Sequence, residues 1–73
     1  EKNMKINIEE VKNLINENFG NKLTNFVAAI GVDYSYMNLI MNGHRASDSK
    51  KVCVRIIEYC KKNNLDYSKY IFF

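Results

Sequence analysis

The main indication of the fold comes from residues 22–45, KLTNFVAAIGVDYSYMNLIMNGHR. Two apolar runs with helical spacing flank the four residues Ile30-Gly31-Val32-Asp33. Glycine with a positive φ commonly ends a helix, and Asp is a favoured N-cap for the helix that follows. A linker this short does not let the two helices lie antiparallel, and a crossing of about 90–120° is favoured instead. These residues therefore predict a helix-turn-helix unit at about residues 22–42.

The remaining glycines and several polar residues mark the ends of further helices. Gly20 and Gly43 each follow an apolar segment with helical spacing, where a left-handed residue would stop the helix. Asn7 lies three residues before Glu10, which is the spacing of a capping box. Polar residues suited to capping also precede the other apolar runs: Asn21 or Lys22, Ser47 or Asp48, and Asp66.

These features predict an all-α fold, a compact five-helix bundle, with helices at about residues 8–19, 22–30, 34–42, 48–62 and 67–72. The apolar faces of the helices would form one core, and the best candidates for its centre are Phe26, Val27, Ile30, Met37, Ile40 and Ile56. Residues 5–8 alternate like a strand. Because four residues with no partner run cannot form a sheet, no strand is expected.

Composition and charge narrow the class of protein. The 73 residues are 47% hydrophobic and 26% charged, which is typical of one soluble globular domain, here spanning residues 1–73. No apolar run approaches the roughly 18 residues of a membrane span, and no targeting pattern is present, so we expect a cytoplasmic protein that does not enter a membrane.

The net charge of +3 is unevenly distributed. The first 36 residues hold four Lys and five acidic residues, whereas the remainder holds seven Lys or Arg and three acidic residues. Five basic or titratable residues fall in one short stretch of the second half: His44, Arg45, Lys50, Lys51 and Arg55. A local excess of this kind attracts a polyanion.

No catalytic or metal-binding constellation is present in the sequence. Cys53 and Cys60 lie seven apart in a predicted helix, so their Cα atoms would be about 10 Å apart, too far for a disulfide. We expect them to be buried and to act as small hydrophobes. His44 is the single histidine, so zinc-ligand spacing is absent, and Ser35 has no His nearby. The sequence therefore predicts neither an enzyme nor a protein with a metal, a cofactor or a small-molecule substrate.

Residues 22–45 resemble the helix-turn-helix of the Cro and CI phage repressors, also called the XRE family. The positions that match the family's apolar and glycine pattern are Phe26-Val27, Ile30-Gly31-Val32, Met37, Ile40 and Asn42-Gly43. The segment Leu65-Asp66-Tyr67 with Tyr70-Ile71 resembles the short closing helix of the family, so the resemblance covers nearly the whole chain. It implies a five-helix bundle of the phage-repressor DNA-binding type.

The resemblance implies binding of double-stranded DNA as a two-fold dimer, with the helix at residues 34–42 in the major groove. The residues carried over to base contacts are Tyr34, Ser35, Asn38 and Leu39. Their chemistry permits this, because Asn pairs with adenine, a hydroxyl donates or accepts, and an apolar side chain contacts the thymine methyl group. The residues carried over to phosphate contacts are Lys22, Thr24, Tyr36, His44, Arg45, Lys50 and Lys51. The function implied is that of a transcriptional regulator, such as a repressor, of phage or mobile-element type.

Departures from the family pattern leave an alternative open. Lys22-Leu23-Thr24 stands where the family commonly has a phosphate-binding Gln, and Val27 stands where a small residue is usual. The helix at residues 34–42 has no Arg, Lys or Gln to read guanine. Tyr34 and Tyr36 belong to a residue type that is enriched in protein interfaces. The alternative is therefore a helix-turn-helix fold reused as a protein-interaction module, an inhibitor or adaptor, that binds through these tyrosines and their neighbours.

The C-terminal end of the sequence concentrates large apolar or amphipathic side chains: Tyr67, Tyr70, Ile71, Phe72 and Phe73. These residues either cover the core beneath the first and fourth helices or form a contact surface between two copies of the chain. A symmetric homodimer would align two recognition helices one DNA turn apart.

Overall fold

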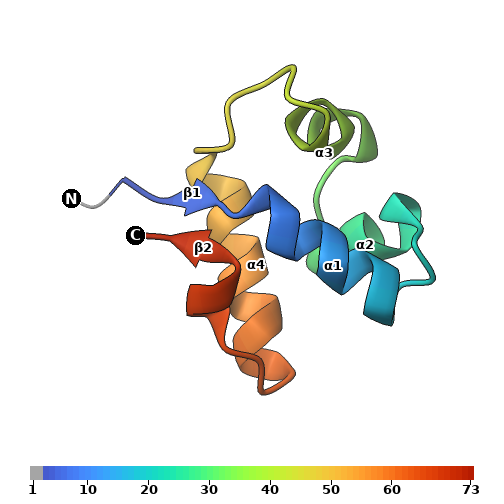
Figure 1. Ribbon diagram of the computed structural model, residues 1–73, viewed down its shortest axis with the longest axis vertical. Helices are drawn as coiled ribbons and strands as arrows, with labels where there is room; N and C mark the ends of the chain where they lie inside the picture. Colours follow the sequence, from blue (N-terminus) through green and yellow to red (C-terminus); the bar gives the residue numbers. More distant parts are fainter. Residues whose placement is uncertain (1–2) are drawn as a thin grey trace.

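The computed structural model describes residues 3–73 and is mostly helical (Figure 1). Within this range it has four α-helices: α1 (Ile8–Asn18), α2 (Leu23–Ile30), α3 (Tyr34–Met41) and α4 (Lys50–Lys62). Each begins and ends within two residues of its predicted bounds. None of these helices, in the part of the chain just given, has the length and apolar character needed to cross a membrane.

The fifth predicted helix, at residues 67–72, is wrong. The chain forms a single 3-10 turn, η1 (Tyr67–Lys69), followed by a short strand, β2 (Ile71–Phe72). The N–H of Tyr70 donates to the carbonyl of Tyr67 at 3.0 Å, which closes the turn after three residues. The chain then pairs with a strand from the N-terminal end and does not coil further.

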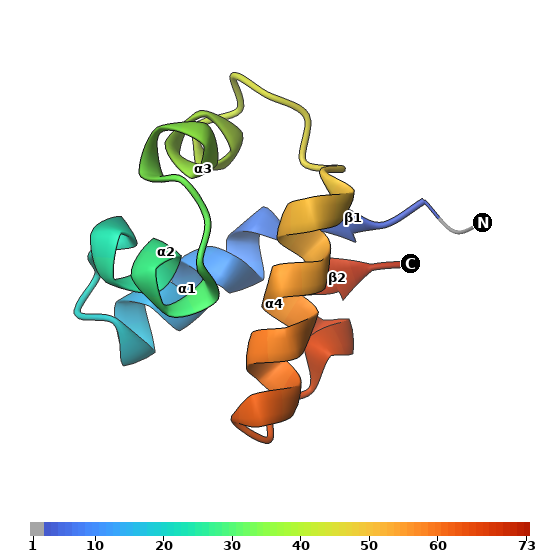
Figure 2. The same cartoon turned by 180° about the vertical axis from the view of Figure 1, so that it is seen from behind.

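The two ends of the described chain form a small antiparallel sheet. β1 (Lys5–Ile6) pairs with β2, with Lys5 opposite Phe72 and Ile6 opposite Ile71. The prediction that no strand forms is therefore wrong, because the partner run lies at the far end of the sequence, where a local pattern does not reveal it. On the other edge of β1, the N–H of Ile6 donates to the carbonyl of Ser47 at 2.7 Å. Figures 1 and 2 accordingly show the sheet beside the start of α4.

Three predicted N-caps are confirmed. Each side chain accepts a hydrogen bond from a backbone N–H two or three residues on: Asn7 from Glu10, Asp33 from Tyr36, and Asp66 from Ser68. At the start of α2, the cap position is Lys22, which makes no side-chain capping hydrogen bond. These caps explain why the helices begin where the sequence predicts.

The cap of α4 differs from the prediction of Ser47 or Asp48, which is wrong. Ser49 is the N-cap, and its hydroxyl accepts from the N–H of Val52 at 3.3 Å. The reason lies in the sheet: the carbonyl of Ser47 accepts from Ile6, which ties this part of the chain to β1 before the helix begins.

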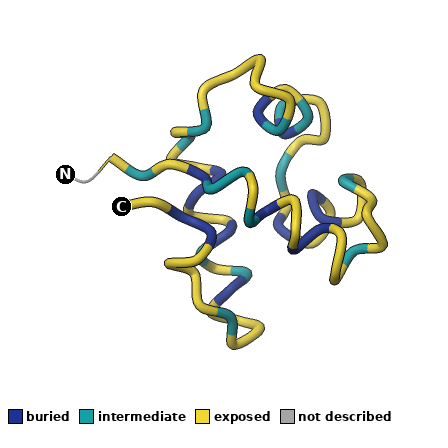
Figure 3. The backbone as a smooth tube through the Cα atoms, viewed as in Figure 1, coloured by how far each residue is buried: buried dark blue, intermediate teal, exposed yellow. Residues whose placement is uncertain are grey.

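One hydrophobic core lies between the helices and the sheet (Figure 3). All six residues predicted for its centre are buried: Phe26, Val27, Ile30, Met37, Ile40 and Ile56. Cys53 and Cys60 are free thiols and are buried as predicted. Tyr70 and Ile71 extend the core beneath the sheet, so part of the C-terminal cluster covers the bundle.

The turn between α2 and α3 determines where α3 lies. Gly31 ends α2 in the left-handed conformation with φ of +75°, as predicted, and its N–H donates to the carbonyl of Val27 at 2.8 Å. Val32 is half-buried in the turn, and Asp33 caps α3. Figures 1 and 2 show α3 nearly along its axis, whereas α4 runs along the plane of the view. Gly31 therefore ends α2 and separates it from α3, and both views show α3 at the edge of the molecule.

Candidate functional site

α3 is held to the core on one face and turns its other face to solvent. Met37 and Ile40 are buried, whereas Ser35 is exposed. Tyr34 and Leu39 retain 45% and 38% of their surface. The outward face of α3 therefore combines a hydroxyl group with exposed apolar surface.

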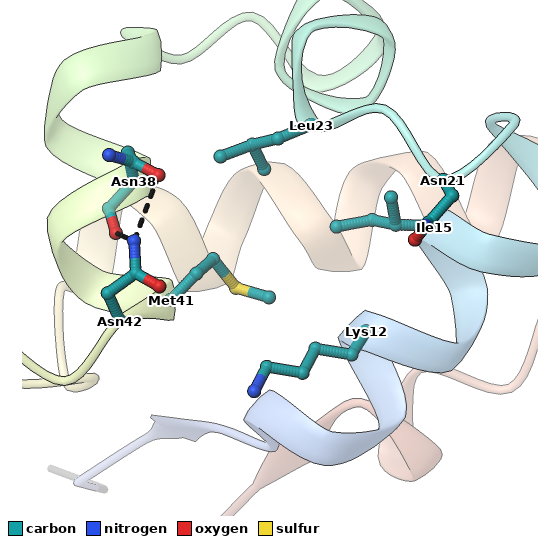
Figure 4. Close-up of a pocket in the computed structure, with 7 residues that line it drawn as sticks. All are labelled: Lys12, Ile15, Asn21, Leu23, Asn38, Met41 and Asn42. Carbon is teal, nitrogen blue, oxygen red and sulfur yellow. Dashed lines mark hydrogen bonds between the residues drawn. The ribbon is translucent and has the colours of Figure 1, made fainter.

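Asn38 is the one predicted base-contacting residue that is partly covered. The side chain of Asn42, one turn further on, donates from Nδ2 to the backbone carbonyl of Asn38 at 2.9 Å and to its Oδ1 at 3.0 Å (Figure 4). The sequence prediction did not include Asn42 among the site residues. Amide side chains four residues apart on a helix form hydrogen bonds, so this spacing could have identified the pair.

Two of the predicted phosphate-contacting residues meet on the opposite flank of α3. The guanidinium carbon of Arg45 lies 5.1 Å from the ring centroid of Tyr36, which is half-buried. A cation over an aromatic ring at an exposed site is worth about 0.5–1 kcal/mol. Two predicted phosphate contacts, one on α3 and one on the following loop, are thus brought together, and the contact holds the loop against the helix.

The other predicted phosphate contacts lie on three different elements. Lys22 and Thr24 are exposed at the start of α2, and His44 is exposed in the loop that follows α3. Lys50 and Lys51 begin α4, which Figure 1 shows at the far end of that loop, beside β1. The structure thus places cationic side chains at the start of α2 and in the loop after α3, with Lys50 and Lys51 at the start of α4, where that loop ends.

A cavity of about 290 Å³ adjoins α3 (Figure 4). Its apolar lining is Ile15, Leu23 and Met41, and its polar lining is Lys12, Asn21, Asn38 and Asn42. Lys12 comes from α1 and adds a positive charge to this side of α3. No local pattern marks Lys12 as a site residue, because only the packing of α1 against the other helices brings it near Asn38.

The C-terminal cluster is divided between core and surface. Tyr70 and Ile71 are buried, whereas Phe72 and Phe73 are 57% and 59% exposed. The ring centroids of Tyr67 and Phe73 are 5.9 Å apart, so these two side chains form a small aromatic patch beside β2. Figure 1 shows β2 on the opposite side of the molecule from α3.

Residues 3–73 contain no group of three His, Cys, Asp or Glu side chains placed to hold a metal ion. Comparison of the chain with protein-family models, with curated proteins and with solved structures gives no significant match.

Proposed function

We propose that the protein binds double-stranded DNA with α3 in the major groove and acts as a transcriptional regulator of phage or mobile-element type. The observation that carries this proposal is the sharp turn at Gly31, after which α3 presents an outward face while Met37 and Ile40 fix it to the core. The major groove of B-DNA is about 12 Å wide and accepts an α-helix. In this account α2, the turn and α3 form a helix-turn-helix, within a domain of the phage-repressor type.

The base contacts come from the outward face of α3. Asn38 pairs with adenine, Ser35 donates or accepts a hydrogen bond, and Leu39 contacts a thymine methyl group. Tyr34 lies at the first position of the helix and adds a ring and a hydroxyl at the edge of the groove. The exposure of Tyr34 and Leu39 supports these roles. Contact with a base removes their apolar surface from water, which is favourable in free energy.

The phosphate contacts come from the cationic and polar residues on either side of α3. Lys22 and Thr24, at the start of α2, contact one strand, aided by the backbone N–H groups of the helix N-terminus. Tyr36, His44 and Arg45 contact the backbone on the other side of the helix, and the stacking of Arg45 on Tyr36 supports this arrangement. Lys50 and Lys51 extend the positive surface to the start of α4.

Two copies of the chain form a symmetric dimer through the aromatic patch of Tyr67 and Phe73 together with the exposed Phe72. The exposure of Phe72 and Phe73 supports this contact. β2 pairs with β1 on one edge, and within the two-stranded sheet of the described chain its second edge has no strand beside it. Two-fold pairing at this edge would leave α3 of each copy uncovered and able to contact DNA.

The direct experiment compares charge reversal near the proposed interface with the same change far from it. Lys51→Glu should weaken binding to any duplex several-fold in fluorescence anisotropy, because it removes a phosphate contact and adds repulsion. Lys62→Glu, at the far end of the same helix, is the matched control and should leave affinity nearly unchanged. Equal effects of the two variants, or no duplex binding by the wild-type protein, would contradict the proposal.

A protein partner is the second candidate function, and the exposure of Tyr34 together with Leu39 favours it. Exposed aromatic side chains anchor protein interfaces. Tyr36, the other predicted anchor, is half-buried under Arg45, which leaves less of its ring for a partner. Binding of a protein through Tyr34 would depend weakly on salt, whereas binding of DNA depends steeply on it.

A further inference from the structure

We infer that α3 selects A·T base pairs and that Asn42 is the residue that positions Asn38 for this selection. The inference rests on the proposed function, since it concerns which bases α3 contacts in the major groove. Beyond the proposed function, it names the base pair that α3 selects. It also gives a role to Asn42, which contacts Asn38 and does not contact the base.

The chemistry of the outward face favours A·T over G·C. Guanine is read chiefly by Arg or Lys, which donate to its two acceptors, O6 and N7. Over Tyr34–Met41 the sequence of α3 is YSYMNLIM, which contains neither Arg nor Lys. What α3 offers is an amide, a hydroxyl and exposed apolar surface. Adenine presents one acceptor and one donor, which match an amide, and thymine presents a methyl group, which matches Leu39.

The hydrogen bonds of Asn42 fix the orientation of the Asn38 amide. Nδ2 of Asn42 donates to two oxygens of Asn38, the backbone carbonyl and Oδ1. If the Asn38 amide were flipped, its Nδ2 would face the Nδ2 of Asn42, and two donors would oppose each other. The Oδ1 of Asn38 therefore points toward Asn42 and its Nδ2 points away, as Figure 4 shows.

A fixed amide is suited to adenine. Oδ1 of Asn38 retains a second lone pair, and within residues 3–73 neither hydrogen of its Nδ2 makes a hydrogen bond. These groups supply the acceptor and the donor that adenine N6 and N7 require. Because Asn38 is also partly buried, less side-chain entropy is lost when it contacts a base than for a mobile amide. Asn42 thus acts as a positioning residue.

The test is selection of duplexes from a randomised pool of about 20 base pairs, enough for two half-sites. It is carried out with the wild-type protein, Asn42→Ala and Asn63→Ala. Asn63 is the matched control, because its Nδ2 makes the same contact with the carbonyl of Tyr59, at 2.9 Å, at the end of α4. Both variants lose a hydrogen bond at a helix end, but only Asn42→Ala releases the amide of Asn38. Thermal melting of both variants checks that the fold is kept.

The wild-type protein and Asn63→Ala should enrich A·T pairs and bind the enriched duplex at least about fivefold more tightly than its G·C-substituted counterpart. Asn42→Ala should lose most of that preference while still binding duplex DNA. Enrichment of G·C pairs, or full retention of the preference by Asn42→Ala, would overturn the inference. If none of the three proteins retains any duplex, the proposed function itself would be overturned.

A second measurement tests the thymine contact independently. Uracil in place of thymine removes the methyl group from the enriched duplex and leaves the pairing unchanged. The wild-type protein should bind the uracil duplex several-fold more weakly, and Leu39→Ala should bind the two duplexes equally. Equal binding of both duplexes by the wild-type protein would overturn the thymine contact.

Discussion

Gly31 is the residue on which the orientation of α3 depends. Its φ of +75° lies in the left-handed region, and a Cβ there would meet the Arg55 side chain at an ordinary contact distance of 3.7 Å. The cost of a side chain is therefore backbone strain and not a clash. We predict that Gly31→Ala lowers the free energy of unfolding by about 1–2 kcal/mol, measured by urea denaturation.

Gly43 provides the control for this substitution. Its φ is +79°, and a Cβ there would meet nothing within 4 Å. Gly43→Ala should therefore cost nearly as much as Gly31→Ala, because the strain is the same. A neutral or stabilising Gly31→Ala would mean that the turn does not require the left-handed conformation.

The residues whose structural role could be predicted from the sequence are those that act on nearby backbone groups. Asn7, Asp33 and Gly31 act on backbone groups within a few positions of themselves, so their residue type and spacing were sufficient. Arg45 over Tyr36 could not be predicted as a pair, because it depends on the path of the loop after α3.

Among the elements, the start of α4 can be tested through its N-cap, Ser49. The hydroxyl of Ser49 accepts from the N–H of Val52, so Ser49→Ala should destabilise the protein by about 0.5–2 kcal/mol in urea denaturation. Ser47→Ala is the control, since the hydrogen bond of Ser47 with Ile6 uses its backbone carbonyl. A larger loss for Ser47→Ala than for Ser49→Ala would show that the cap lies at Ser47.

The two buried thiols of α4 make the stability of the protein depend on pH in the alkaline range. Burial, and to a smaller extent the carboxylates of Asp48 and Asp66, raises the pKa of the Cys53 and Cys60 thiols above the ordinary value of 9.0. Because the folded state holds these protons more tightly, this contribution is complete below pH 9.0 and is lost as the pH rises through the folded-state values. We predict that the free energy of unfolding, measured by urea denaturation, falls as the pH rises over this range.

The double variant Cys53→Ala, Cys60→Ala isolates the thiol contribution. Burial also raises the pKa of Tyr70 above 10.0, which adds a further loss of stability at higher pH. The double variant should keep only this Tyr70 contribution, so its stability should depend less on pH than that of the wild-type protein. Identical pH profiles for the two proteins would contradict the prediction.

The α-helices were predictable and the sheet was not, for a physical reason. Apolar residues at helical spacing and polar caps are present within each helix, so the four α-helices follow from local sequence. β1 and β2 have two residues each and exist only because the two ends of the described chain meet. A strand this short has no periodicity of its own, so the sequence alone predicts a helix end at Ile71–Phe72.

For the whole molecule, the aromatic patch at the C-terminal side predicts self-association. Sedimentation velocity over micromolar concentrations should show a monomer–dimer equilibrium, and Phe72→Ser should shift it toward monomer. Leu39→Ser, which removes an exposed apolar side chain on α3, is the control and should leave the equilibrium unchanged. A strictly monomeric wild-type protein would contradict the proposed dimer, and the protein would then bind one half-site.

The candidate site was predicted in part. Helical periodicity places Met37 and Ile40 inside and so fixes which residues of α3 face outward. It does not reveal contacts between elements, such as the approach of Lys12 on α1 to the cavity beside Asn38. Contacts that depend on the packing of distant elements require the three-dimensional structure.

The salt dependence of duplex binding shows whether α3 and its flanking cations bind DNA. Lys22, Arg45, Lys50 and Lys51 would neutralise about four phosphates per protomer, and each releases about 0.9 counterion. A plot of the logarithm of the association constant against the logarithm of the salt concentration should therefore have a slope of about −3.6 per protomer. A slope near zero, or no measurable affinity for any duplex at low salt, would contradict the claim that α3 and its flanking cations bind DNA.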